Sequence, residues 1–306
     1  MTSQPPAASG PGLADYGLLL LISAIWGSSF LFIKVAVETM PAVSMTAARL
    51  TLAGIILVAL AVLSKQPMPK GNRLWGWILM SALFGNALPF ALIGWGEEKI
   101  DSGLAAILMA VMPLTTLLLA HIFTKDEKIT LPKAIGVVLG FVGLIVLIGP
   151  AKLATLGEET VRQLAVASAA VCYGINAIIT KQFTGLPPRS LAAAVVMTSA
   201  LMLIPASFFF DAPLTLEPSL ISSIAIASLA VFHTVIATLL LFTIVRRQGA
   251  AFFSQLNYLV PPFGVAWGAL LLAERPSPNA YIALGLILLG IAIAGLKFGG
   301  KKTPVS

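Results

Sequence analysis

A few polar and aromatic residues interrupt the long apolar stretches of this sequence, and their chemistry could serve a function. Asn86, Asn176 and His233 each stand in the middle of such a stretch, as do the aromatic residues Trp26 and Tyr173. A buried polar group costs free energy unless it is paired, so each is either a structural hydrogen-bond partner or part of a binding site. The candidate substrate-binding residues are Trp26, Asn86, Tyr173, Asn176, His233, Gln255, Asn257 and Tyr258.

This set has the chemistry of a binding site for neutral, partly aromatic solutes. Amide and imidazole groups donate and accept hydrogen bonds, and aromatic rings pack against flat or apolar ligands. Asn86 and His233 lie 147 residues apart, a spacing that recurs along the chain. A structural role stays open for each residue. An amide can instead join two helices with a hydrogen bond of about 0.6 kcal/mol, and Trp26 can instead pack in the core.

Arg49 is the one formal charge that lies well inside an apolar stretch. A charge at the centre of a bilayer costs about 2.5–3.5 kcal/mol on insertion scales. One interpretation is that Arg49 is an outer-vestibule charge that binds a substrate carboxylate. The other, which we favour slightly, is a structural pairing with a nearby acidic residue; the candidates are Glu38, Glu97, Glu98 and Asp101.

Catalytic and cofactor chemistry is not indicated by any motif. The sequence has no GxSxG nucleophile motif and no GxxxxGK[ST] phosphate loop, so we expect neither an enzyme nor a cofactor. Cys172 is the single cysteine, and no Cys/His spacing suggests a metal site. No Asp or Glu stands in the middle of an apolar stretch. His233 is therefore the candidate proton carrier, and a facilitator or exchanger is the alternative to a proton-driven pump.

The composition requires that membrane helices position these residues. Of 306 residues, 58% are hydrophobic and only 10% are charged, with a mean hydropathy of +0.98. Soluble domains carry about 25% charged residues. This chain cannot cover its surface with polar groups in water, so we expect an integral membrane protein in a lipid bilayer.

Breaks at Pro, Gly and charge clusters divide the chain into segments of about 20 apolar residues, the length that crosses the hydrocarbon core. Thirteen Lys and Arg residues fall on the side of the two termini and five on the opposite side, which predicts cytoplasmic termini. This bias explains the net charge of +7 without a nucleic-acid partner. We expect an all-α membrane protein with ten transmembrane helices at 14–35, 43–63, 74–96, 102–123, 130–149, 162–182, 190–210, 219–245, 249–272 and 279–297.

The two halves of the chain repeat each other at an offset of 147 residues. Trp26 corresponds to Tyr173 and Gly27 to Gly174; further pairs are Lys34 with Lys181, Glu127 with Glu274, and Gly143 with Gly290. We expect an N-terminal tail (1–13), a first five-helix repeat (14–150), a linker (151–161), a second five-helix repeat (162–297) and a C-terminal tail (298–306).

Five spans per repeat is an odd number, so the second copy must enter the membrane from the opposite side. Two inverted-topology repeats are typical of secondary transporters, in which two equivalent packings expose a central site alternately to each side. This parity argument predicts transport as the function.

The sequence resembles EamA-type members of the drug/metabolite transporter superfamily. The resemblance rests on AIWGSSFLFIK (24–34) and on two corresponding segments, each with a mid-helix proline, an acidic–basic pair and a glycine-rich helix (112–143 and 260–290). It covers nearly the whole chain, and among the members it is most similar to aromatic amino-acid exporters. The chain departs from the pattern at Tyr173, which replaces a Trp, and at Ala283, which replaces a Gly.

The resemblance implies ten spans and export of amino acids, other metabolites or toxic compounds. We therefore expect a multi-pass, bacterial-type inner-membrane secondary transporter that exports amino acids, aromatic or other neutral, and related small metabolites or drugs. Transport would proceed by alternating access around a central cavity, with no obligate protein partner. The alternative is a multidrug, organic-cation or nucleobase exporter of the same fold. A channel or a non-transport membrane subunit is less favoured.

Overall fold

Helices are the expected elements because the bilayer interior offers no partner for an unpaired backbone group. The computed structural model describes residues 11–123, 129–150, 153 and 157–296. The first half contains α1 (Leu13–Val37), α2 (Ala42–Leu63), α3 (Asn72–Ala82), η1 (Leu83–Ala87), α4 (Leu88–Glu97), α5 (Ser102–Met109), α6 (Met112–Phe123) and α7 (Leu131–Ile148). The second contains α9 (Glu158–Ile179), η2 (Thr180–Phe183), α10 (Pro188–Phe210), η3 (Pro213–Thr215), α11 (Leu220–Ala230), η4 (Val231–Ile236), α12 (Ala237–Phe253), α13 (Leu256–Leu271) and α14 (Pro278–Ala294).

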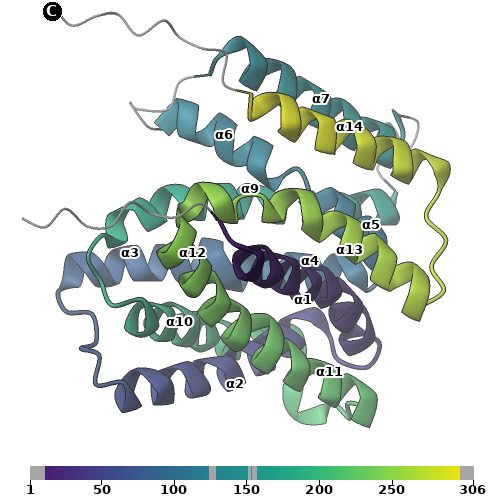
Figure 1. The fold of residues 1–306 in the computed structure, drawn as a ribbon. Helices are drawn as coiled ribbons and strands as arrows, with labels where there is room; N and C mark the ends of the chain where they lie inside the picture. Colours follow the sequence, from purple (N-terminus) through teal and green to yellow (C-terminus); the bar gives the residue numbers. More distant parts are fainter. Residues whose placement is uncertain (1–10, 124–128, 151–152, 154–156, 297–306) are drawn as a thin grey trace, which may run out of the picture.

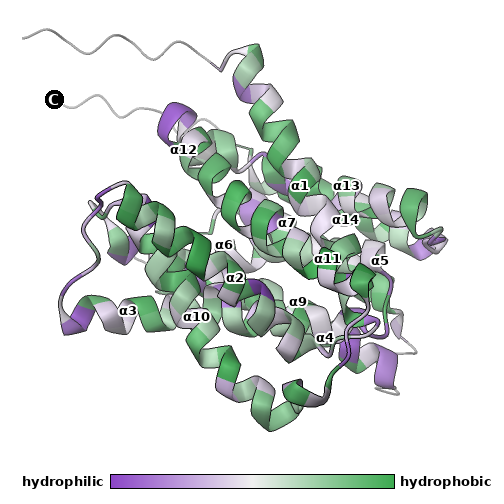
Figure 2. Ribbon diagram, turned by 90° about the horizontal axis from the view of Figure 1, so that it is seen from below, coloured by the Kyte–Doolittle hydropathy of each residue, from purple (hydrophilic) through white to green (hydrophobic). Residues whose placement is uncertain are grey.

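These elements form ten apolar helical spans within the described residues, eight long ones and the shorter α13 and α14. The predicted all-α membrane fold is thus confirmed. The bounds differ in places: α9 begins at Glu158, four residues before the predicted start of the sixth span. α12 contains a break at Gly249, whose φ is 81°, at the residue where the ninth span was predicted to begin. In Figure 2 most of the helical ribbon has the colours of hydrophobic residues, and hydrophilic residues gather mainly in loops and at helix ends.

The helix contacts follow the 147-residue relation between the two halves. α1 packs against α13, and its counterpart α9 packs against α6 in the same way. α7 packs along α14 and α2 along α10, so both pairs join a helix to its own counterpart. In Figure 1 these two pairs lie at the top and bottom of the molecule, with α1, α9 and α13 between them. A twofold relation between the two repeats produces this reciprocity. Because each repeat has five spans, an odd number, the second repeat runs in the inverted orientation.

Small residues allow the close approach of α7 and α14. A Cβ added at Gly290 would lie 2.6 Å from the carbonyl oxygen of Gly136, and a Cβ added at Gly143 would lie 3.1 Å from that of Ala283. The two contacts are exchanged by the 147-residue offset, and backbone-to-backbone contact of this kind is typical of membrane helix pairs. The glycines of the repeated signature act similarly, because a Cβ at Gly27 would lie 2.6 Å from Phe263 Cβ.

The third and eighth spans each contain one π-helical segment, η1 and η4, at corresponding positions. A π-helical turn interrupts the regular hydrogen-bond ladder, and such turns are frequent at functional sites. At these segments, side-chain hydroxyls donate hydrogen bonds to backbone carbonyl oxygens. Ser199 Oγ donates to Ala82 O at 3.0 Å, and Thr234 Oγ1 donates to Leu229 O at 3.0 Å. Ala82 and Leu229 are again 147 residues apart.

Ion pairs join the ends of corresponding spans on opposite sides of the membrane. Asp15 at the start of α1 pairs with Arg247 of the eighth span at 2.9 Å. Arg162 at the start of α9 pairs with Glu98 at the end of the third span at 2.7 Å. Asp15 and Arg162 are counterparts in the repeat, so the two halves use the same contact with the signs of the charges exchanged.

The glycine contact between α7 and α14 yields a stability prediction. We expect Gly290→Leu to lower the free energy of unfolding by about 1–3 kcal/mol, because the added side chain has no space against α7. Gly285→Leu in the same helix is the control, since a Cβ added there has no neighbour within 4 Å. Thermal unfolding of the purified protein in detergent measures both effects. Equal melting temperatures for the two variants would contradict this packing.

Candidate substrate site in the centre of the bundle

His233 lies in η4 and is 5% exposed, with both ring nitrogens in polar contact. Nδ1 lies 3.0 Å from the carbonyl oxygen of Ser228, and because a carbonyl can only accept, Nδ1 carries a hydrogen. Nε2 lies 3.0 Å from the hydroxyl oxygen of Ser28 in α1, and the ring of Phe32 packs against the imidazole at 4.9 Å between centroids. The histidine therefore ties the eighth span to the first with its tautomer fixed by the backbone.

Arg49 of α2 lies beside this histidine segment and is only 4% exposed. Its Nε donates a hydrogen bond to Thr234 Oγ1 at 3.1 Å. The guanidinium carbon lies 4.1 Å from the centre of the Phe90 ring in α4, a cation–π contact. Thr234, which follows His233 in the chain, thus accepts a hydrogen bond from Arg49 and at the same time donates one to the carbonyl oxygen of Leu229.

Within the described residues, the structure shows no ion pair between Arg49 and any of the acidic residues that the sequence offered as its partner. Across the described ranges, no carboxylate oxygen lies within ion-pair distance of Arg49, and Glu98 pairs with Arg162 instead. Of its three nitrogens only Nε has a hydrogen-bond acceptor among the residues that the structure describes. Two guanidinium nitrogens are therefore free to bind a ligand in a buried position.

Tyr173 of α9 is a third predicted residue within electrostatic range of Arg49. Arg49 interacts electrostatically with Tyr173 and with His233. Tyr173 is half-buried, and its hydroxyl makes no hydrogen bond to any described residue. Arg49, Tyr173 and His233 come from the second, sixth and eighth spans, so three separate helices position the site.

The two predicted asparagines have different surroundings. Asn176 accepts a hydrogen bond from Ser81 Oγ at 2.8 Å and lies against Gly85 of η1, a contact that joins the sixth span to the third. This geometry matches the structural alternative of an interhelical hydrogen bond. Asn86 is half-buried in η1, and within the described part of the chain its amide has no hydrogen-bond partner. Asn86 therefore remains the better candidate for contact with a ligand.

The remaining predicted residues gather around the ninth span. Trp26 packs edge-on against Phe253 with ring centroids 6.0 Å apart. Gln255, which immediately precedes α13, is exposed, while Asn257 and Tyr258 are half-buried in its first turn. No described contact joins these four predicted residues to Arg49 or His233, so they form a separate neighbourhood.

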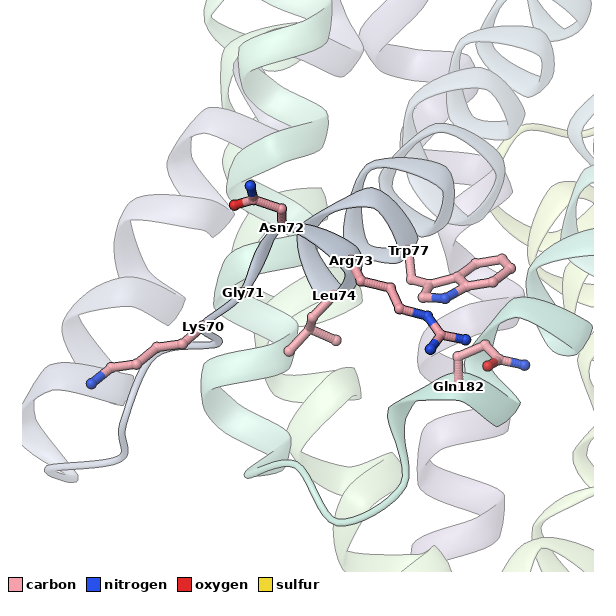
Figure 3. A pocket seen from close by; sticks show the side chains of 7 residues that line it. All are labelled: Lys70, Gly71, Asn72, Arg73, Leu74, Trp77 and Gln182. Carbon is pink, nitrogen blue, oxygen red and sulfur yellow. The ribbon is translucent and has the colours of Figure 1, made fainter.

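A shallow pocket lies at the start of α3, at the end of the bundle that the charge bias predicts to be cytoplasmic. Figure 3 shows the side chains of Arg73 and Gln182 close together across it, with Trp77 behind; the other lining residues are Lys70, Gly71, Asn72 and Leu74. None of the predicted site residues lines this pocket. Its two basic residues match the positive charge expected at that face.

Sequence reasoning missed several residues of the central group: Ser28, Phe32, Phe90 and Thr234. The serine and threonine are common in membrane helices as local backbone partners, and phenylalanines are indistinguishable from ordinary core residues. The 147-residue offset carries no signal for them either, since Thr234 corresponds to Ala87.

The bond between Arg49 and Thr234 gives a second stability prediction. Thr234→Val should lower the free energy of unfolding by about 1–3 kcal/mol, because it leaves the buried Arg49 Nε without an acceptor. Thr243→Val is the matched control on the same span, since Thr243 Oγ1 only donates to Leu239 O. Chemical or thermal unfolding in detergent compares the two. If Thr243→Val is as destabilising as Thr234→Val, the hydrogen bond between Arg49 and Thr234 adds nothing measurable to the free energy of unfolding.

Comparisons with known proteins agree with this architecture. A family model described as "EamA-like transporter family" matches residues 15–149 and, a second time, residues 162–296. The chain is 28% identical over 289 residues to the "Uncharacterized inner membrane transporter YedA" of Escherichia coli K12, covering 92% of this chain and 90% of that protein. It is 30% identical over 255 residues to "Protein PagO" of Salmonella typhimurium LT2, covering 80% of each chain.

Two further similarities are more distant. The "Uncharacterized transporter YoaV" of Bacillus subtilis 168 is 24% identical over 286 residues, covering 93% of this chain and 97% of that protein. A solved crystal structure is similar with a TM-score of 0.65 at 20% identity, covering 92% of this chain and 97% of the other. This last likeness shows the shared fold.

Proposed function

The chain belongs to the EamA-like transporter family, and from this premise we propose that it exports amino acids, aromatic or other neutral, across the inner membrane. It does so as a secondary transporter, by alternating access around a site in the centre of the bundle. The similarity to an E. coli protein named as an inner membrane transporter supports the location. The reciprocal contacts of the two repeats support the mechanism, since they allow two equivalent packings.

We infer the substrate class from the buried Arg49, which has no carboxylate partner among the described residues. A guanidinium presents its donors in a fork that fits a carboxylate, which every amino acid carries. The Nε donates to Thr234, which leaves the two remaining nitrogens available to bind a carboxylate. Each charge-assisted hydrogen bond contributes about 1.5–3 kcal/mol.

Aromatic and polar neighbours suit the rest of an amino acid. The Phe90 ring lies under the guanidinium, and Phe32 lies beside His233, so apolar surface is available next to the anion site. The hydroxyl of Tyr173 and the amide of Asn86 have no described partner and can bind the substrate's polar groups. Export of an organic cation is disfavoured at this site because Arg49 repels it. A nucleobase, which lacks a carboxylate, would use the polar groups alone.

A counterflow experiment in proteoliposomes tests the substrate class. Vesicles loaded with unlabelled phenylalanine should accumulate labelled phenylalanine, and external 2-phenylethylamine, which lacks the carboxylate, should not compete. Arg49→Gln should reduce the flux at least about tenfold, since it removes a charge-assisted contact of more than 1.4 kcal/mol. Arg189→Gln is the control, because Arg189 is exposed and bonded to Ser64 outside the site.

Competition by the amine as strong as that by phenylalanine, or wild-type flux in Arg49→Gln, would refute the carboxylate site. Absence of flux for every amino acid, purine and cationic drug tried would refute transport itself.

A further inference from the structure

Glu97, the last residue of α4, is a buried carboxyl group that the central site does not use. Its exposed fraction is 0%, and neither carboxylate oxygen has a hydrogen-bond partner among the residues that the structure describes. It stands at the end of the third span opposite the predicted cytoplasmic side. The sequence suggested it only as a partner for Arg49, since it lies at the border of an apolar stretch.

The charged groups that face Glu97 are engaged elsewhere. The ammonium of Lys34 in α1 donates to the backbone carbonyls of Glu97 and Ile100, at 2.7 and 2.9 Å, instead of to the carboxylate. Glu274 accepts from the backbone of Ser102 and Gly103, the first two residues of α5, at 2.7 and 2.9 Å. Both Lys34 and Glu274 interact with Glu97 electrostatically, one attracting and one repelling the carboxylate.

Two further groups complete these surroundings. Arg49 in α2 interacts with Glu97 electrostatically but forms no ion pair with it within the described residues. Arg162 of α9 is bonded to Glu98, the next residue along the chain, at 2.7 Å. Every charged neighbour therefore leaves the two Glu97 oxygens unbonded.

The fold itself does not require a carboxyl group at this position. The counterpart of Glu97 in the second repeat is Ile244, an apolar residue that is buried as deeply, at 1% exposed. An ionised carboxylate without hydrogen bonds is very unfavourable in a dry interior, and it is neutralised by a proton. A metal ion is a poorer ligand here, because no cluster of three or more metal-binding side chains occurs among the described residues and Lys34 and Arg49 repel a cation.

We propose that Glu97 is a proton-binding site that controls closure of the outer end of the transporter. When this end closes and Glu97 is buried as it is in this structure, the carboxylate takes up one proton from the outer solution and becomes a neutral carboxylic acid. When it opens, the O–H bond breaks and the proton returns to water, leaving a carboxylate beside Lys34. This inference rests on the proposed alternating-access cycle, and it adds proton dependence to the return step.

Thermal unfolding between pH 5 and pH 8 tests the site without any transport measurement. The folded protein with its outer end closed holds a proton that the unfolded chain releases. The free energy of unfolding should therefore fall as the pH rises. The melting temperature of Glu97→Gln should depend less on pH. Glu98→Gln is the matched control and should keep the wild-type dependence, since that neighbour is ion-paired. If the Gln variant fails to fold, Glu97→Ile places the residue of the other repeat at this position.

Counterflow at equal pH on both sides tests the coupling to closure. Wild-type exchange should decrease as the pH rises, by up to about tenfold per pH unit for one required proton, whereas the Glu97→Gln rate should stay constant. The same pH dependence of unfolding in wild type and Glu97→Gln would overturn the proton site. An altered unfolding profile with identical flux profiles would overturn its role in closure. No flux in any variant would instead refute the proposed function, and the unfolding curves would still decide the proton site.

Discussion

The arrangement of the site depends on one constraint: in a bilayer, a backbone carbonyl without a helical partner must find another donor. η1 and η4 interrupt the regular α-helical hydrogen-bond pattern at corresponding places, and there the hydroxyls of Ser199 and Thr234 donate to the carbonyls of Ala82 and Leu229. In the second repeat the same hydroxyl also accepts from Arg49. The position of Arg49 thus depends on a π-helical segment in the opposite repeat.

The two repeats share their scaffold but not their chemistry. The glycine contacts and the π-helical turns recur at an offset of 147 residues, and in the end-of-span ion pairs one partner, Asp15 or Arg162, does so. The functional candidates break this symmetry, because Arg49 corresponds to Val196 and Glu97 to Ile244, both buried. We propose that the symmetry of the repeats allows the alternating movement, and that the residues that differ between the halves bind substrate and control the proton.

Much of the fold could be predicted because span length, charge bias and a constant offset are properties of sequence alone. Even the start of the ninth span was expected at Gly249, where the structure places a break. The site was harder to predict. Hydropathy does not reveal a π-helical turn, so the pairing of Arg49 with Thr234 was invisible, and Asn176 was grouped with Asn86 although it bonds to Ser81. Glu97 was treated as a border residue because burial at a span end depends on the neighbouring helices.

The central claim is that residues in the middle of the bundle face each side of the membrane in turn. Since Cys172 is the single cysteine, Cys172→Ser gives a background for one probe, and Asn86→Cys places it in η1. The measurement is labelling by a membrane-impermeant thiol reagent, applied from either side of oriented vesicles. The account predicts that the reagent labels the cysteine from each side. Substrate conditions that favour the state open to one side should reduce labelling from the other side. Simultaneous full access from both sides, or access from one side under all conditions, would contradict it.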